Sequence, residues 1–518
     1  MQQGLNPPTG SDAIRLTVRD LRIDSELPET ITVRSDQALP IGREISAAEV
    51  YRFARALQDR VLDQGYPLAR VIIPPQDMDA AQAVVRIRII SGFVEAIDVS
   101  ALPPRVRGIV QQMLAPVAGQ RAMRAHELER RLVIAGNTAG LDLRSALTPG
   151  RQIGATVLLL SGQHRLVQGA LSVDNRQGSE LGGVQTTMSI AANSALRLGE
   201  QLVISLAAPL SDVTWSQGLR RYASVSAKLP IGRDGLHAGS TIIFSASKPR
   251  VSGQASLQFE SEYRLASLFL AYPLLLKRNS QMTVQLSLEA AFEQTATTLL
   301  GPRIPLSEDR TRVVRAQVSG FHALPQDRRI DYSIEFTKGF SGLGARAISD
   351  ASVLLPLSRL GADASFHRLS GDVKLTSPVA GQISAYLLLR AATGFGAPLL
   401  RSEQESFATP DLISGLQGGS AAGDDLYGGR FELRGEWEYG SSRIIPYAFG
   451  ALATAHLAQP LATELAHVQA GAAGAGIRLA VSPKGALPMF LTAEWAHIDR
   501  VGIEPRRSRV TVSFGARY

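Results

Sequence analysis

Charged side chains occupy every second position in one stretch near the carboxyl end of the chain. Glu432, Arg434, Glu436 and Glu438 alternate with apolar or small residues over 431–439. Because successive side chains of a β-strand point to opposite faces, all four charges lie on one face. Such a face meets water, either inside the lumen of a β-barrel or outside a soluble sheet. These four residues are candidates for lumen-facing charges, and a solvated outer face is the alternative.

Motifs for catalysis and cofactor binding are missing from the sequence. The chain has no P-loop and no His-Glu-x-x-His zinc motif, and its eight His residues are scattered. It contains no Cys, which argues against disulfides, thiol catalysis and Cys-ligated zinc. We therefore expect a protein that is not an enzyme and that uses no cofactor or metal.

Length, hydropathy and charge further limit the classes of protein to which the chain can belong. A chain of 518 residues can hold two to four domains. No run of about 18 apolar residues occurs, so transmembrane helices are excluded, and a membrane protein without them must be a closed barrel. The net charge is +8, but the Arg residues are spread along the chain. This distribution favours a solvated or pore-lining role over binding of nucleic acid.

The elements that precede the charged stretch form two small α/β modules. The first combines a strand at 14–19, a helix from Ser46 to Gly65 and strands at 69–74 and 83–90, with Ser46 and Glu49 as a capping box. The second combines a strand at 93–100, helices at 105–114 and 126–134, and strands at 143–147 and 155–160. We predict a tail at 1–12, domains at 13–92 and 93–163, and a third region at 164–518.

The third region alternates apolar and polar residues to its end. At about 22 residues per strand and connection, it allows sixteen strands, an even number as in single-chain bacterial barrels. The last strand ends on an aromatic residue, Tyr518, as expected at a membrane interface. It must pair with the first strand to remove both edges, which places Phe514 and Tyr518 near Asp174 and Asn175. The predicted fold class is α+β periplasmic domains followed by a transmembrane antiparallel β-barrel.

Short motifs in this order resemble a known family, the outer-membrane transporters of two-partner secretion, which export haemolysins and filamentous haemagglutinins. The resemblance covers almost the whole chain. It is carried by Gly65-Tyr66-Pro67-Leu68-Ala69-Arg70, Glu127-Leu128-Glu129-Arg130, Pro149-Gly150, Val173-Asp174-Asn175 and Ala271-Tyr272-Pro273-Leu274. It implies two polypeptide-transport-associated (POTRA) domains in the periplasm and a sixteen-stranded barrel in the bacterial outer membrane.

The resemblance also implies a function. Edge strands of the POTRA domains would capture an unfolded client protein, which would cross the barrel and fold outside. The expected partners are a large, β-helical secreted client and outer-membrane lipid, with no nucleic acid, and the transporter would be a monomer. The alternatives are a barrel assembly factor of the same superfamily, a passive channel, and a soluble binding protein with a β-rich domain.

The chain departs from the family in its long sixth extracellular loop, near 407–430. The segment Ile413-Ser414-Gly415-Leu416 resembles the tip of this loop in the family, but it has Ser414 where the family has Arg. The strand position of the family's Asp partner is Ala451. Loss of both partners is physically reasonable, because removing only one partner of a buried pair costs about 3–5 kcal/mol.

A substitute pair is expected in this loop. Asp424 and Asp425 lie near Arg430, and we predict that they pair and hold the loop.

The amino-terminal segment lacks two features of the family. The first thirty residues contain no apolar stretch of signal-peptide type, so we expect a mature or re-engineered start with Met1 added. About thirteen residues precede the strand at Ile14, whereas a helix that plugs the pore needs roughly 20. We therefore predict a more open resting pore.

Overall fold

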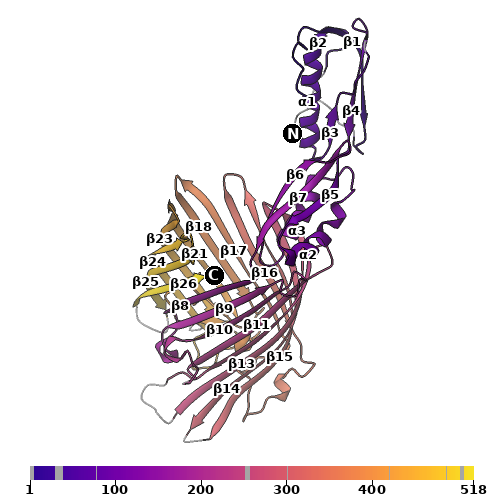
Figure 1. Ribbon diagram of the computed structural model, residues 1–518. Coiled ribbons are helices and arrows are strands. Elements are labelled where there is room, and N and C mark those ends of the chain that lie inside the picture. Colours follow the sequence, from indigo (N-terminus) through magenta and orange to yellow (C-terminus); the bar gives the residue numbers. More distant parts are fainter. Residues whose placement is uncertain are drawn as a thin grey trace. The chain divides into compact units, whose positions relative to one another are not determined.

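The computed structural model describes residues 5–29, 39–77, 79–216, 218–250, 257–299, 302–418, 421–485, 487–501 and 507–518. The chain forms two compact units, the first ending at His164 and the second comprising the barrel strands that follow (Figure 1). Among the described residues, no helix is long and apolar enough to cross a membrane.

The first module of unit 1 packs helix α1 (Ala47–Asp63) on a four-stranded sheet of order β2-β1-β4-β3. The strands are β1 (Arg15–Ser25), β2 (Glu44–Ser46), β3 (Arg70–Ile72) and β4 (Ala83–Ile90), with β1 and β4 parallel. One apolar stripe of α1, with Val50, Phe53 and Leu57, is buried in the core. The core also includes Leu5, which holds the described part of the tail in this module.

The predicted capping box at the start of α1 is wrong. Ser46 is the N-cap residue, but its side chain makes no capping hydrogen bond. Glu49 instead lies 3.4 Å from Arg52 in an ion pair on the helix surface.

The second module contains β5 (Phe93–Ala101), α2 (Pro104–Leu114), η2 (Ala115–Val117), α3 (Ala125–Gly136), β6 (Leu141–Pro149) and β7 (Ala155–His164). Its sheet has the order β5-β7-β6, so β6 forms one edge. Gly92 lies between the two modules, where a Cβ atom would come within 1.8 Å of the Leu68 carbonyl oxygen. Only glycine permits this close approach of two backbone segments.

Unit 2 is a closed antiparallel barrel of sixteen strands, in which β21 and β22 act as one strand interrupted at Glu436. In order, the strands are β8 (Val167–Asp174), β9 (Gln185–Asn193), β10 (Gln201–Pro209), β11 (Arg220–Ile231), β12 (Leu236–Ser247), β13 (Leu257–Lys277), β14 (Ser280–Leu299), β15 (Arg303–Leu324), β16 (Arg328–Gly339), β17 (His367–Ala380), β18 (Ile383–Thr393), β21 (Asp425–Gly435), β22 (Trp437–Tyr439), β23 (Ser442–His456), β24 (His467–Val481), β25 (Met489–Val501) and β26 (Arg507–Arg517).

The barrel closes between β26 and β8. Ser513 pairs with Asp174, and Phe514 pairs with Val173. The Asn175 side chain extends this seam, because its amide donates to the Val510 carbonyl at 3.1 Å and its oxygen accepts the Val512 N–H at 2.8 Å. The backbone of Tyr518 forms two hydrogen bonds with Gly169 of β8. The structure thus places the four predicted closure residues along one seam.

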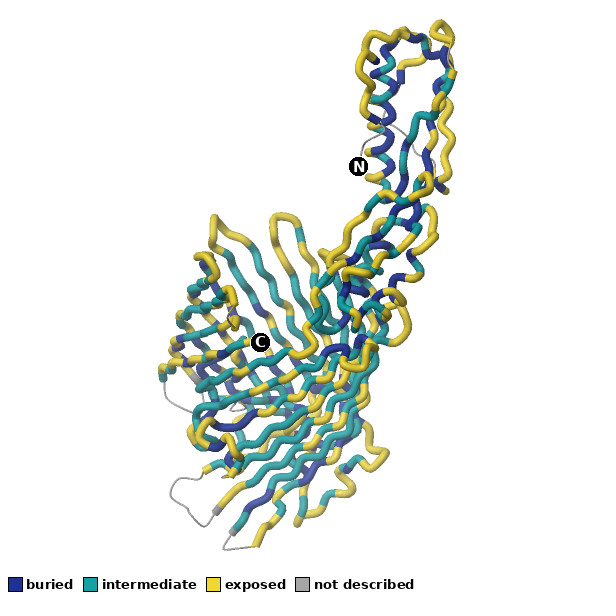
Figure 2. The backbone as a smooth tube through the Cα atoms, in the orientation of Figure 1, coloured by how far each residue is buried: buried dark blue, intermediate teal, exposed yellow. Residues whose placement is uncertain are grey.

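The two faces of the barrel wall differ. Outward apolar side chains such as Ile204, Ile242 and Leu268 are 44%, 61% and 63% exposed, as a lipid-facing surface requires. Most residues of the strands are only partly buried (Figure 2). Short turns join the strands at the end where β8 begins.

Longer loops lie at the opposite end of the barrel. They are loop 5 (340–366), loop 6 (394–424) and loop 7 (457–466), and loop 6 is described except at 419–420. The short elements in these loops are η5 (Ile348–Asp350), η6 (Arg401–Glu403), β19 (Glu405–Ser406) and β20 (Ala422–Gly423). Two further turns, η3 (Ser179–Leu181) and η4 (Leu210–Asp212), lie between earlier strands.

Candidate functional site: the seat of loop 6

The tip of loop 6 packs on the inner wall of the barrel. Ile413 and Leu416 are buried in one hydrophobic cluster with Ala451. The wall offers small side chains to the tip, namely Ala451, Ala453, Ala470, Ala472 and Ala496. A Cβ atom at Gly415 would lie 3.2 Å from the Ala496 Cβ, so the glycine allows the tip to approach the wall closely. The residues expected at the loop tip and at the strand position therefore lie together.

A buried ion pair on the wall holds this tip. Arg430 of β21 is 1% exposed, and its Nη2 donates to Glu494 Oε2 of β25 at 2.6 Å. Its Nη1 donates to Ser414 Oγ at 3.2 Å, and Ser414 Oγ in turn donates to Glu494 Oε1. Tyr447 donates its hydroxyl proton to Glu494 Oε2 at 2.8 Å. Both charges thus belong to the wall, and the loop tip contributes a neutral hydroxyl group.

Glu432 extends the network along the lumen. It accepts hydrogen bonds from Arg430 Nε and Arg434 Nε, both at 2.7 Å, and from two nitrogens of Arg478 at 3.1 Å. A buried carboxylate is tolerated only when it is paired in this way. Glu436 and Glu438 lie outside this network, since Glu436 pairs with Arg443 and Glu438 is exposed next to the β22–β23 turn.

The predicted pairing of Asp424 or Asp425 with Arg430 is not formed. Asp425 and Arg430 lie on opposite faces of β21, because their positions differ by an odd number. Asp424 and Arg430 are six residues apart, or about 20 Å along an extended strand. Asp425 instead accepts a hydrogen bond from Thr393 Oγ1 at 2.6 Å.

Asp424 joins three loops. Its buried carboxylate pairs with Arg359 of loop 5 and accepts the Ala458 N–H of loop 7 at 2.7 Å. It also accepts the Leu399 N–H at 2.9 Å and the Gln404 side-chain amide at 3.1 Å, both within loop 6. Asp424 thus ties loop 6 to its neighbours at the outer end of the barrel, away from the tip.

A second group of ion pairs holds the first half of loop 6. Glu403 accepts hydrogen bonds from Arg315 Nη2 of β15 at 2.9 and 3.1 Å, and Arg315 also pairs with Glu289 at 2.8 Å. Burial raises the pKa of the Glu403 carboxyl, although Arg315 opposes this effect. Asp411 pairs with Arg390 of β18 at 2.8 Å. Burial of Asp411 favours its neutral form, but Arg390 and the hydrogen bond from Thr409 together lower the pKa of the carboxyl.

Several members of these networks carry no recognisable sequence signal. Glu494 is one of two acids on strand β25, and it is 64 residues from Arg430. Arg315 and Arg359 are likewise isolated in the sequence from the acids that they contact. The alternation of apolar and polar residues identifies a lumen face, but it does not identify these partners.

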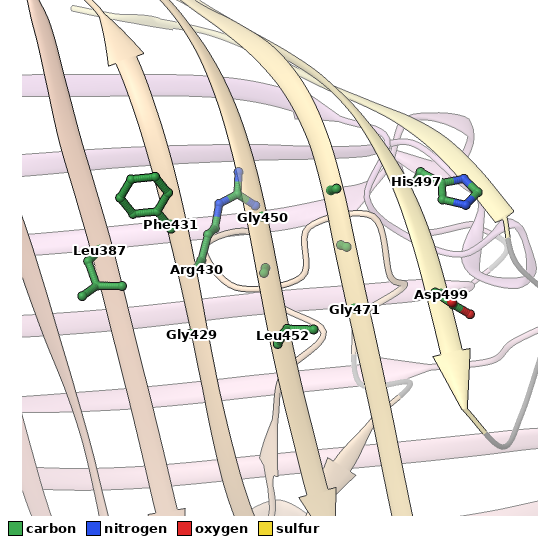
Figure 3. Close-up of a pocket in the computed structure, with 12 residues that line it drawn as sticks. Leu387, Gly429, Arg430, Phe431, Gly450, Leu452, Gly471, His497 and Asp499 are labelled. Atoms are coloured by element: carbon green, nitrogen blue, oxygen red, sulfur yellow. The ribbon is translucent and has the colours of Figure 1, made fainter.

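On the outer face of the barrel wall, behind the site where the tip of loop 6 packs, small residues also line the surface. A groove of about 540 Å³ runs over Gly429, Gly450 and Gly471, with Leu387 and Asp499 at opposite sides (Figure 3). The wall therefore has small residues at several positions on both faces where loop 6 packs. No cluster of metal-ligating side chains occurs among the described residues.

The chain matches known proteins in both sequence and fold. Residues 154–450 match the family model of the haemolysin secretion/activation protein ShlB/FhaC/HecB, and residues 35–92 match the ShlB-type POTRA domain. None of the curated proteins shows a significant sequence match.

Solved structures share the fold at low sequence identity. CdiB from Escherichia coli has a TM-score of 0.71 and 16% identity, with 99% of this chain and 92% of that chain covered. CdiB from Acinetobacter baumannii has a TM-score of 0.61 and 15% identity, with 97% and 90% covered. BamA from Haemophilus ducreyi lacking POTRA domains 1–3 has a TM-score of 0.51 and 11% identity, with 97% and 100% covered. Because the family model spans more than half of the sequence, the chain belongs to the ShlB/FhaC/HecB family of haemolysin secretion/activation proteins, the outer-membrane transporters of two-partner secretion.

Proposed function

We propose that this protein captures one unfolded client in the periplasm and exports it through the barrel to the cell surface. The observation that carries the proposal is a loop seated inside a closed barrel, in a chain that also contains two POTRA-like modules. The short turns of the barrel then face the periplasm, and loops 5, 6 and 7 face outward. The client is a large secreted protein, β-helical in the pattern of the family.

The edge strand β6 is the proposed capture site. Among the described strands, β6 pairs only with β7, so its other edge is available. An extended client segment can add to such an edge through main-chain hydrogen bonds. Most residues of β6, including Ser145 and Leu147, are exposed, so side chains do not block the approach.

Because the tip of loop 6 is neutral, its release from the barrel wall costs little free energy. If the tip leaves the wall, Arg430 keeps Glu494 and Glu432 as partners, and Glu494 keeps Tyr447. No buried charge is then left without a partner, whereas withdrawal of a charged tip would leave one. The seat can therefore open and close while the wall network persists.

Deletion of the gene and comparison of surface proteomes tests the proposal. We expect the loss of one large surface protein and its return on complementation with the wild-type gene. An unchanged surface proteome would contradict client export. Depletion of many outer-membrane barrels would instead support an assembly factor, and loss of small-solute uptake alone would support a passive channel.

A further inference from the structure

One sector of the inner wall differs chemically from the seat of loop 6. The middle of the inner face of β9–β12 carries hydroxyl groups from Thr187, Ser189, Ser205, Ser224, Ser226, Thr241 and Ser245. We call these residues the hydroxyl strip. Ser189 Oγ lies 2.9 Å from Ser205 Oγ, and Ser226 Oγ lies 3.1 Å from Thr241 Oγ1, so neighbouring hydroxyl groups satisfy one another.

Charged side chains on this face lie only at its ends. Arg220 lies toward loops 5–7, and Lys228 with His237 lies toward the short turns. Between these positions, the inner face of β9–β12 carries no charged residue in the part of the chain that the structure describes. The strip therefore offers weak, neutral hydrogen-bonding groups along the middle of the barrel.

Loop 6 is bound to the other side of the lumen. Its hydrogen bonds and ion pairs to barrel strands, within the described residues, go to β14, β15, β17, β18, β21, β23 and β25. None goes to β8–β12 in the same described set. The hydroxyl strip therefore lies in a sector of the wall to which loop 6 forms no hydrogen bond or ion pair among the described residues.

We infer that the exported chain slides along the hydroxyl strip, on the wall opposite the seat of loop 6. This inference rests on the proposed export function. Passage through a pore requires contacts that favour entrance but are weak enough to permit exit. Neutral hydroxyl groups meet this condition, because hydrogen bonds to charged groups are roughly twice as strong. The occupant is an extended, unfolded polypeptide rich in small, uncharged side chains, which offers amide and hydroxyl partners.

Single-cysteine variants test this route cleanly, because the chain contains no Cys. Ser205→Cys and Ser226→Cys place a thiol on the strip, and Ala451→Cys places one beneath the loop 6 tip as the matched control. Each full-length variant is inserted in a planar bilayer and then treated with a cationic methanethiosulfonate reagent. Because the reagent is added after insertion, it cannot affect the folding of the barrel. A long unfolded polypeptide of Gly, Ser and Asn, added on the POTRA side, then serves as the client probe.

We expect the reagent to lower the conductance of the two strip variants and to leave that of Ala451→Cys unchanged. We also expect it to shorten the polypeptide blockades only in the two strip variants. Blockades that respond to the reagent at Ala451→Cys but not at Ser205→Cys would overturn the strip as the route. If the thiol pattern holds but the polypeptide blocks no variant, the strip lines an ion path and the export function itself is contradicted.

Discussion

At the scale of single residues, Arg430 is bound mainly to the wall and only secondarily to the loop. It contacts Glu494 and Glu432 on the barrel and Ser414 on the tip. The ion pair that holds the seat therefore does not cross from the loop to the wall. Asp424, by contrast, makes all its side-chain contacts with loops 5, 6 and 7. Arg430 therefore gives a prediction about the stability of the barrel, and Asp424 gives one about how tightly the outer loops close it.

Arg430→Met should destabilise the barrel more than Ser414→Ala. The first change removes a buried cation from beside Glu494, at a cost of about 3–5 kcal/mol. The second removes one neutral hydrogen-bonding group, at a cost of about 1 kcal/mol. The temperature at which the folded barrel unfolds in detergent on a gel measures both effects. Equal shifts for the two variants would show that the pair is not structural.

Asp424→Asn should loosen the loops at the outer end of the barrel. Arg359 would lose its charge partner while remaining buried. The amide oxygen could accept from only one of Leu399 and Ala458, because these two N–H groups bond different carboxylate oxygens. We expect higher single-channel conductance and greater sensitivity of cells to bulky antibiotics. Asp425→Asn is the matched control, because Asp425 lies next in sequence but binds Thr393. The same increase in both variants would exclude a specific role for Asp424.

At the scale of elements, loop 6 is held at its tip and again near its start, so its movement can be tested by tethering. The Cβ position of Gly415 lies 3.2 Å from the Ala496 Cβ, near the 3.5–4.5 Å range of disulfides. Ser319 of β15 and Ser333 of β16, which are directly paired outside the hydroxyl strip, offer a control disulfide that leaves loop 6 free.

Gly415→Cys with Ala496→Cys should stop secretion when oxidised and restore it on reduction, because the disulfide fixes the tip to the wall. Ser319→Cys with Ser333→Cys should secrete under both conditions, since it links two wall strands outside the hydroxyl strip. Surface display of the client in the presence and absence of a reductant measures the effect. Full secretion by the oxidised loop-tethered variant would show that the tip need not move.

At the scale of the whole molecule, the resting pore should conduct ions without a client. The described part of the amino-terminal segment packs into its own module, where Leu5 is 6% exposed. Loop 6 binds one side of the lumen and, among the described residues, forms no hydrogen bond or ion pair to the hydroxyl strip. We expect steady single-channel conductance from the purified full-length protein in planar bilayers. A barrel that stays closed at all voltages would contradict this prediction.

The sequence by itself determined the sixteen-stranded barrel and the mixed α/β architecture that precedes it, because alternation and helical periodicity are local properties. It also indicated that Glu432 and Arg434 share a face, since that follows from spacing along one strand. It misassigned the partners of Asp424, Asp425 and Arg430, because proximity along a chain says little about contact across a barrel. Only the tertiary structure brought Arg430 to Glu494, 64 residues away on another strand. Barrel closure and the return of loop 6 into the lumen decide such long-range pairs, and the local pattern that predicts a strand or a loop does not specify these partners.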